Sequence, residues 1–363
     1  MSTPSILILP GDGIGPEVTA AARTVLESVA RHYGHRFEFR EGAIGGCAIE
    51  SAGAPLPAET LALCTAARGV LLGAVGGPQW SDPAASVRPE QGLLALRRAL
   101  GVYANLRPVA THPALYGASP LKDALLDDVD ILFVRELTGG IYFGDKRRTA
   151  DQASDLCAYT RAEIERVVRL GCRLARQRSG RLTSVDKANV LETSRLWRET
   201  ASRVAREEFP DIRLEHALVD AAAMQLIQSP RRFDVVVTEN MFGDILTDEA
   251  SVITGSIGML PSASLPESGP GLYEPIHGSA PDIAGRDVAN PCGAILSAAL
   301  LLRHSLGLES EAVAVEAAVW RVIERGVGTT DIVGAGVTAA STAEVAAAVA
   351  AELQQGGADR AIA

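Results

Sequence analysis

The sequence predicts an α/β fold with more than one domain, and three observations carry this prediction. The chain has 363 residues, the length of about two domains. Short apolar runs of strand length recur along it, and stretches with a helical apolar period lie between several of them. Such alternation is typical of strands and helices that share an α/β sheet.

The apolar runs are interpreted as buried strands, and the first leads through a turn into a helix. The runs lie at residues 5–10, 70–75, 131–134, 182–185, 214–219 and 235–238. Residues 11–15, Gly-Asp-Gly-Ile-Gly, form the turn, and Pro16 and Glu17 suit the first turn of a helix. The apolar period of that helix continues to Val29, and a second helical period runs from Ile164 to Ala175.

Two stretches break the alternation. Residues 139–160 combine a Gly-Gly pair with aromatic and charged residues and have no helical period, so we expect a protruding, strand-rich arm there. Residues 291–353 are mostly Ala-rich and predict helices. The chain has no repeats and no long linkers, so the domains are not expected to be simple sequential blocks.

Composition and charge exclude several classes of partner. The formal net charge is −10, which argues against nucleic acid and against an anionic membrane surface. Residues 292–302 form the longest uncharged run of membrane-like character, far short of the ~20 residues of a spanning helix. The start does not resemble a signal peptide, and the five cysteines lack a disulfide or zinc spacing, so we expect a cytoplasmic protein with reduced, mostly buried thiols.

The glycine-rich start does not match a dinucleotide fingerprint. Gly11, Gly13 and Gly15 depart from G-x-G-x-x-G, because Pro16 stands where the last glycine is required. A strand-to-helix turn and a phosphate cradle are equally acceptable interpretations of this loop.

Carboxylates with metal-like spacing follow near residue 240. Asp244 and Asp248 are four residues apart and would share one face of a helix. Residues 234–249 hold five acids and no base, and hard oxygen ligands favour Mg²⁺ or Mn²⁺ over zinc. Asp220 ends a predicted strand, a position where α/β enzymes bind ligands. For each of these residues, a role at a solvated helix N-terminus is the simpler alternative.

An arginine-rich segment contrasts with the acidic chain. Residues 88–107 carry four Arg and one Glu. On a helix, Glu90, Leu93, Leu94 and Arg97 would share one face, which suits a ligand with an alkyl group and carboxylates. Arg107 and Arg135 lie near predicted strand ends, and separate salt bridges remain an equal alternative to a shared anionic substrate.

Six motifs, in this order along the chain, resemble the metal-dependent β-decarboxylating dehydrogenases of the isocitrate/isopropylmalate dehydrogenase family. They are Arg-Pro-Glu-Gln-Gly-Leu-Leu-Ala-Leu-Arg at 88–97, Tyr-Ala-Asn-Leu-Arg-Pro at 103–108, Arg-Glu-Leu-Thr-Gly-Gly-Ile-Tyr-Phe-Gly at 135–144, Asp-Lys-Ala-Asn at 186–189, Asn-Met-Phe-Gly-Asp-Ile-Leu-Thr-Asp at 240–248 and Glu-Pro-Ile-His-Gly-Ser-Ala-Pro-Asp at 274–282. The resemblance extends from residue 10 to about residue 308 and is closest to the branch that acts on 3-isopropylmalate.

The resemblance implies a fold that is not a Rossmann fold. Two α/β domains would share a mixed central sheet, one of them made of residues 1–102 and 255–363 and the other of the inserted residues 103–254. The arm around 139–160 would help to form a homodimer.

The resemblance also implies roles for individual residues. Arg97, Arg107 and Arg135 would hold the substrate carboxylates, with Glu90, Leu93 and Leu94 selecting the side chain. Asp244 and Asp248, with Asp220 from the partner subunit, would hold Mg²⁺ or Mn²⁺. Lys187, also from the partner, would be the general base and Tyr142 the general acid. The cofactor residues would be Glu274, His277, Gly278, Ser279, Ala280, Asp282 and Asn290.

The implied reaction is the NAD-dependent oxidative decarboxylation of (2R,3S)-3-isopropylmalate to 4-methyl-2-oxopentanoate, a step of leucine biosynthesis. Asp282 favours NAD, because a carboxylate there would repel the 2′-phosphate of NADP. Leu93 and Leu94 suit an isopropyl group, where isocitrate-specific relatives carry small polar residues.

Three departures from the family pattern keep alternatives open. Residues 144–148 lack the usual Pro-Arg-Gly, residues 151–157 of the arm are atypical, and Glu239 stands where Gly or Ser is common. A D-malate or tartrate dehydrogenase of the same family is the first alternative. A non-catalytic family subunit is a second, against which the presence of Lys187 and Tyr142 argues. A metal enzyme without redox chemistry is a third.

Overall fold

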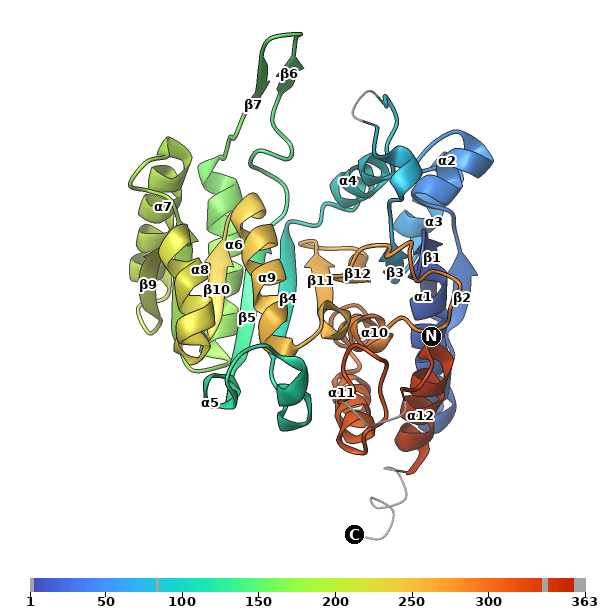
Figure 1. Cartoon of the computed structure of the whole chain (residues 1–363). Helices are drawn as coiled ribbons and strands as arrows, with labels where there is room; N and C mark the ends of the chain where they lie inside the picture. Colours follow the sequence, from blue (N-terminus) through green and yellow to red (C-terminus); the bar gives the residue numbers. More distant parts are fainter. Residues whose placement is uncertain (1–2, 83–84, 335–338, 356–363) are drawn as a thin grey trace. The chain divides into compact units, whose positions relative to one another are not determined.

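The computed structural model of the chain describes residues 3–82, 85–334 and 339–355 (Figure 1). The chain divides into two compact units. The terminal unit consists of Met1–Val102, Gly117–Ser119 and Gly255–Ala363, and the inserted unit of Tyr103–Tyr116 and Pro120–Thr254. This division differs from the predicted domains in one place, because residues 117–119 group with the terminal unit.

The terminal unit contains a mixed set of strands. Among its described residues, the strand order is β2-β1-β3-β12-β11. Their bounds are β1 (Ser5–Gly11), β2 (Glu38–Glu41), β3 (Gly69–Ala74), β11 (Pro261–Leu265) and β12 (Gly271–Pro275). The pairs β1–β2, β1–β3 and β3–β12 are parallel, and β11 runs antiparallel to β12. The predicted strands at 5–10 and 70–75 are confirmed, whereas β2, β11 and β12 were not predicted.

The helices of the terminal unit pack around these strands. Those described are α1 (Gly15–Tyr33), α2 (Gly46–Ala52), α3 (Ala58–Ala66), α4 (Pro89–Leu100), α10 (Cys292–His304), α11 (Glu309–Glu324) and α12 (Thr342–Gln355), with the short η1 (Pro78–Trp80) and η4 (Ile257–Met259). Every residue from 292 to 302 in α10 is buried, since this helix lies between β11, β12 and β3 and the helices α1 and α11. The predicted Ala-rich helices are confirmed as α10, α11 and α12.

The inserted unit also contains a mixed set of strands. Within its described part the order is β4-β5-β10-β8-β9. Their bounds are β4 (Ala104–Ala110), β5 (Asp130–Glu136), β8 (Arg181–Asp186), β9 (Arg213–Leu218) and β10 (Val235–Thr238). All pairs are parallel except β4–β5. The carboxyl ends of β5, β10, β8 and β9 therefore lie along one edge, which is where α/β sheets place functional side chains.

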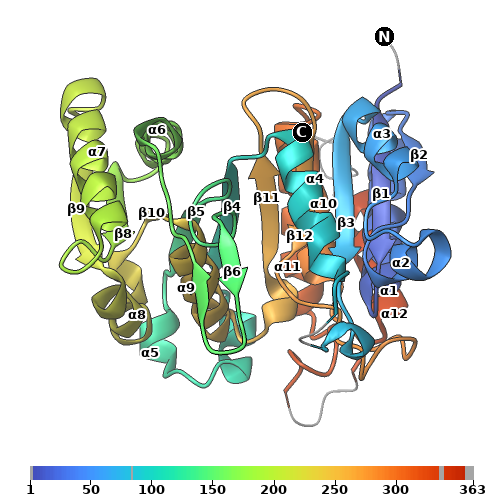
Figure 2. The same cartoon turned by 90° about the horizontal axis from the view of Figure 1, so that it is seen from above.

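Helices cover both faces of the inserted unit's strands. They are α5 (Asp123–Leu126), α6 (Arg161–Arg176), α7 (Glu192–Glu208), α8 (Val219–Gln228) and α9 (Asn240–Thr254), with the short η2 (Pro113–Ala118) and η3 (Pro230–Arg232). Figure 2 shows α6 and α7 on one side of the strands and α8 and α9 on the other. The predicted strands of this unit and the helical period at 164–175 are confirmed.

The predicted arm is confirmed as a hairpin. Strands β6 (Lys146–Arg148) and β7 (Ala153–Asp155) pair antiparallel, and all their residues are exposed. Figure 1 shows this hairpin projecting beyond the other elements of the inserted unit. Residues 139–144, which were predicted as part of the strand-rich arm, instead form turns and bends, in which Gly139 and Gly140 lie against Tyr159. Among the described residues, no helix combines the length and the apolar character needed to cross a bilayer.

Candidate active site

Two buried arginines lie on neighbouring strands of the inserted unit. Arg107 on β4 is 6 % exposed and Arg135 on β5 is 2 % exposed. The antiparallel register places Asn105 opposite Arg135, so Asn105, Arg107 and Arg135 face the same side of the strands. The Nε of Arg107 donates to Oδ1 of Asn105 at 2.7 Å. Helix α9 packs on β4 and β5 and closes this face.

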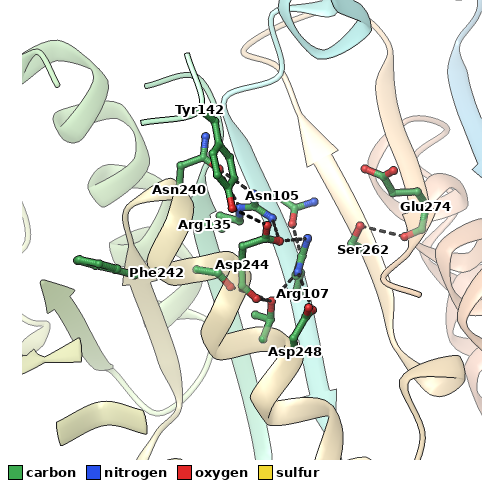
Figure 3. Close-up of polar contacts among 12 residues, drawn as sticks. Asn105, Arg107, Arg135, Tyr142, Asn240, Phe242, Asp244, Asp248, Ser262 and Glu274 are labelled. Atoms are coloured by element: carbon green, nitrogen blue, oxygen red, sulfur yellow. Dashed lines mark hydrogen bonds and ion pairs between the residues drawn. The ribbon is translucent and has the colours of Figure 1, made fainter. Parts of the chain in front are cut away.

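Asp244 of α9 brings the two guanidinium groups together, as Figure 3 shows. Its Oδ1 accepts a short hydrogen bond from Arg135 and a second one from Nη2 of Arg107 at 3.3 Å. Gly243 makes this approach possible, because a Cβ there would lie 2.7 Å from Cγ of Arg135. The arrangement presents two planar hydrogen-bond donors beside a carboxylate, a geometry suited to an anionic ligand.

Tyr142 contacts the same carboxylate from the turn that precedes the arm. Its hydroxyl donates to Oδ2 of Asp244 at 3.1 Å, and the guanidinium carbon of Arg135 lies 5.8 Å from the ring centroid. Burial raises the pKa of Tyr142, and the charge of Asp244 raises it further. The phenol therefore stays protonated at neutral pH, as a proton donor must.

Asp248 lies one helical turn after Asp244. Its Oδ1 is 3.9 Å from Nη1 of Arg107, and its side chain is 62 % exposed. Partial burial of the carboxyl raises the pKa of Asp248, with Arg107 opposing the rise and Asp244 adding to it. Two carboxylates on one helix face supply hard oxygen ligands, so these residues fit a divalent cation of the Mg²⁺ or Mn²⁺ type.

Lys187 and Asp220 form a separate pair within this chain. Lys187 directly follows β8, and Asp220 lies in the first turn of α8, which follows β9. Nζ of Lys187 lies 2.6 Å from Oδ1 of Asp220. The hydrogen bond from Lys187 lowers the pKa of Asp220. Across the described residues, no three acidic, His or Cys side chains gather closely enough to hold a metal ion. Within one chain, Asp220 thus does not join Asp244 and Asp248.

The remaining predicted substrate residues lie on α4 of the terminal unit. Arg97 is buried, and its Nη2 donates to Oε1 of Glu274 at 2.7 Å. Its Nε is buried and has no hydrogen-bond partner among the described residues. Leu93 and Leu94 are half-buried and Glu90 is exposed, so part of this helix face remains open. Glu274, predicted as a cofactor residue, is placed as the ion-pair partner of Arg97.

The predicted cofactor loop follows β12 in the terminal unit. His277 is buried, its Nδ1 contacts the Gly278 carbonyl at 2.9 Å, and its Nε2 has no hydrogen-bond partner among the described residues. Burial lowers the pKa of His277, which keeps the ring neutral. A buried neutral ring with an unmatched nitrogen fits the hydrogen-bonding edge of a heteroaromatic ligand such as adenine.

The glycine-rich start packs directly against this loop. The N–H of Ile14 donates to the Ser279 carbonyl at 2.8 Å, and a Cβ on Gly13 would lie 1.9 Å from that oxygen. Gly13 has a φ of +59°, so glycine is required there on both counts. Ala280 also has a positive φ of 36°, while Asp282 is exposed. Both interpretations of the glycine-rich turn remain compatible with this packing.

Several polar residues around these sites were not predicted. Asn240 accepts from Arg135, Asn105 accepts from Arg107, and Thr247 accepts from Nη1 of Arg107 at 2.5 Å. In the terminal unit, Asp331 accepts from Nδ2 of Asn290 at 3.0 Å. For Asn240 and Thr247, the helical spacing that they share with Asp244 was the available sequence signal.

Comparisons with known proteins agree with the motif resemblance. A sequence model described as isocitrate/isopropylmalate dehydrogenase matches residues 5–349. The chain is 60 % identical to a 3-isopropylmalate dehydrogenase of Anaeromyxobacter dehalogenans over 94 % of this chain and 98 % of that protein. It is 58 % identical to a 3-isopropylmalate dehydrogenase of Bacillus licheniformis, over 95 % of each chain.

A solved structure agrees with the fold. The isocitrate dehydrogenase of Methylococcus capsulatus superposes with a TM-score of 0.86 and 35 % identity, covering 97 % of this chain and all of that one (100 %). The predicted family and the prediction of a mixed α/β fold other than the Rossmann fold are therefore confirmed. The chain belongs to the isocitrate/isopropylmalate dehydrogenase family.

Proposed function

We propose that this chain is an NAD- and divalent-metal-dependent dehydrogenase that oxidatively decarboxylates 3-isopropylmalate to 4-methyl-2-oxopentanoate in leucine biosynthesis. One observation carries the proposal: two buried arginines meet a helix carboxylate beside the Tyr142 hydroxyl. This arrangement combines carboxylate recognition, a metal ligand and a proton donor. The names of the relatives at about 60 % identity support the choice of substrate.

Substrate recognition is assigned to the three arginines and two leucines that the motif resemblance implies. Arg107 and Arg135, with Arg97, bind the two carboxylates of the substrate, and each guanidinium can replace its present carboxylate partner by a substrate oxygen. The half-buried Leu93 and Leu94 contact the isopropyl group. A second carboxylate in that place, as in isocitrate, would lose its hydration without gaining a partner.

The metal is assigned to Asp244 and Asp248 of one subunit and Asp220 of a second copy. Bound Mg²⁺ or Mn²⁺ supplies Lewis-acid polarisation of the substrate hydroxyl and of the ketone that replaces it. The Asp244 oxygens already accept hydrogen bonds from Arg107, Arg135 and Tyr142, so a metal ion would take the remaining acceptor position on Oδ2 or replace one of these contacts.

Proton transfer is assigned to Lys187 and Tyr142. Lys187, from the second copy, would accept the proton of the substrate's C2 hydroxyl, and bound NAD would supply the hydride acceptor. Its 2.6 Å contact with Asp220 keeps the amine beside a proposed metal ligand. After CO₂ has left, Tyr142 donates its proton to C3, which its raised pKa supports by keeping the phenol protonated.

The NAD site is assigned to the loop that follows β12 in the terminal unit. The assigned residues are Glu274, His277, Gly278, Ser279, Ala280, Asp282 and Asn290. The unmatched Nε2 of His277 supports an adenine contact. The exposed carboxylate of Asp282 supports NAD over NADP, since it would accept ribose hydroxyls and repel a phosphate.

We assign a homodimer, formed through the inserted unit, and a cytoplasmic location. Exposed apolar side chains of that unit support the dimer, because such groups are usually covered. They are Leu156, Val190, Leu191, Met224, Ile245 and Val252.

The test is NADH formation from 3-isopropylmalate with and without Mg²⁺, compared with isocitrate, D-malate and tartrate. We expect 3-isopropylmalate to have the highest kcat/KM, no activity after chelation, and loss of activity in Lys187→Met. A faster reaction with D-malate or tartrate would instead support the broader family activity. Near-normal activity of Lys187→Met would exclude Lys187 as the base.

A further inference from the structure

A polar pair, Glu239 and Tyr159, lies behind the arginine site of the inserted unit. Glu239 is 7 % exposed and connects β10 to α9, while Tyr159 lies between the arm and α6. The Tyr159 hydroxyl lies 3.2 Å from Oε2 of Glu239 and accepts the N–H of Asn240 at 3.0 Å. The other oxygen of Glu239 accepts the N–H of Phe242 at 3.0 Å. The pair therefore fixes the first turn of α9.

That first turn holds Arg135. Oδ1 of Asn240 accepts from Nε and Nη2 of Arg135, at 3.0 and 2.8 Å (Figure 3). Nδ2 of Asn240 donates to the Gly139 carbonyl at 3.2 Å. The Tyr159 hydroxyl thus contacts the backbone of Asn240, the same residue whose side chain orients the guanidinium. Any shift of the Asn240 backbone would move Arg135 relative to Asp244.

The same pair contacts the turn that carries Tyr142. A Cβ on Gly140 would lie 2.5 Å from the Tyr159 hydroxyl oxygen and 3.2 Å from Oε2 of Glu239, and Gly140 has a φ of +78°. The N–H of Gly140 donates to the carbonyl of Ala158, next to Tyr159, at 2.9 Å. Tyr159 and Glu239 therefore support both Arg135, through Asn240, and the turn that carries Tyr142.

We propose that Glu239 and Tyr159 act as one positioning pair that sets the Arg135 guanidinium through Asn240 and so determines how tightly the substrate carboxylate binds. The inference rests on the proposed function, because it assigns the pair to the binding of that substrate. Since Arg135 would hold the carboxylate before and during the reaction, loss of the pair should weaken binding more than it slows chemistry.

The experiment is a double-mutant cycle of Tyr159→Phe and Glu239→Ala, with Tyr116→Phe as the matched control. Tyr116 lies in the same unit, and its hydroxyl donates to Asp127 at 3.1 Å, outside the proposed site. We expect Tyr159→Phe to raise the KM for 3-isopropylmalate about tenfold, the effect of one misplaced hydrogen bond. The kcat should change less than the KM, and the KM for NAD should stay within about twofold in both the variant and the control.

The cycle separates a positioning pair from two independent stabilising residues. We expect the double variant to have nearly the KM of Tyr159→Phe alone, because residues that act as one unit are not additive. Additive effects, an unchanged KM for 3-isopropylmalate, or equal losses for NAD and substrate would overturn the proposal. A lower Tm with unchanged KM would assign the pair to stability alone.

Failure of the proposed function has a different signature. If the unsubstituted enzyme prefers another 2-hydroxy acid, the cycle is run with that acid. If it oxidises none, the ¹⁵N resonance of Arg135 Nε, identified by its loss in Arg135→Lys, reports the position of the guanidinium. A shift of that resonance in Tyr159→Phe but not in Tyr116→Phe would support the pair, and an unchanged resonance would overturn it.

Discussion

Variants of Arg97 and Glu274 can separate two effects. One is the loss of stability caused by an unpaired buried charge, and the other is the loss of a proposed contact with the substrate. Nη2 of Arg97 and Oε1 of Glu274 are 2.7 Å apart, and their side chains are only 10 % and 11 % exposed. Arg97→Met would leave the Glu274 carboxylate buried without its cation, which typically costs about 3–5 kcal/mol. For a unit of this size that corresponds to a loss of roughly 6–20 °C in Tm.

The assay combines thermal unfolding with steady-state kinetics on three variants. In Arg97→Met/Glu274→Gln the uncompensated charge is gone, so we expect most of the stability to return. The KM for 3-isopropylmalate should remain high in the double variant, because a proposed carboxylate contact is still missing. Arg98→Met, on the exposed side of the same helix, is the control: it should leave the KM unchanged and lower the Tm much less than Arg97→Met, because exposed charged side chains contribute little to stability.

Two results would refute this reasoning. An Arg97→Met variant with unchanged Tm would show that Glu274 does not depend on the charge of Arg97 for its stability in the folded chain. A double variant that regains both stability and a normal KM would show that Arg97 serves stability and does not bind the substrate.

Three further outcomes follow from single residues. Leu94→Ser should lower kcat/KM for 3-isopropylmalate by about 10–100-fold and change that for D-malate less, since one lost apolar contact discriminates only substrates that use it; equal losses would exclude Leu94 from the pocket. Asp282→Lys should lower kcat/KM with NAD and raise it with NADP, each by about tenfold or ~1.4 kcal/mol, and identical kinetics with both cofactors would contradict the assignment. Burial opposes ionisation of Asp234, but hydrogen bonds from Ser179 and Arg178 outweigh it and lower the pKa of Asp234 below its usual 3.8. Its carboxylate therefore stabilises the fold above about pH 4, and this contribution is lost as the pH falls through the lower folded-state pKa. Urea unfolding at neutral and acidic pH should show a smaller acid loss in Asp234→Asn, and an equal loss would contradict the linkage.

The strands that sequence analysis predicted share one property, a continuous apolar run. β3 and β10 are buried at every position, so their residues show the run directly. β2 is mostly exposed, and β11 and β12 contain Pro, Ser and Gly, so none of the three has a comparable run. Pairing with neighbours brought together by the whole fold makes them strands, and local sequence does not encode that pairing.

The candidate site likewise contains residues that local sequence singled out and residues whose contacts only the fold determines. The arginine excess, the strand-end positions and the carboxylate spacing singled out Arg107, Arg135 and Asp244 as candidates, and the structure brings these three side chains together. Asn105 and Asn240 were missed, since their function depends on the β4–β5 register and on the entry of the chain into α9. An asparagine in sequence is compatible with a turn, a cap or a loop, and only the fold selects the contact.

The charges of the inserted-unit site argue that metal and substrate bind together. Two arginines there are matched by two carboxylates, Arg107 and Arg135 by Asp244 and Asp248, so the set is close to neutral. A dianionic substrate alone would add two negative charges, and a divalent cation alone two positive ones, whereas both together leave the balance unchanged. Calorimetry should therefore find that Mg²⁺ binds at least about fivefold more tightly when 3-isopropylmalate is present, with the reciprocal gain for the substrate. Equal affinities with and without the partner ligand would contradict this charge balance. If the balance holds, the local charges of the site decide which anion it accepts, and the net charge of −10 of the whole chain does not.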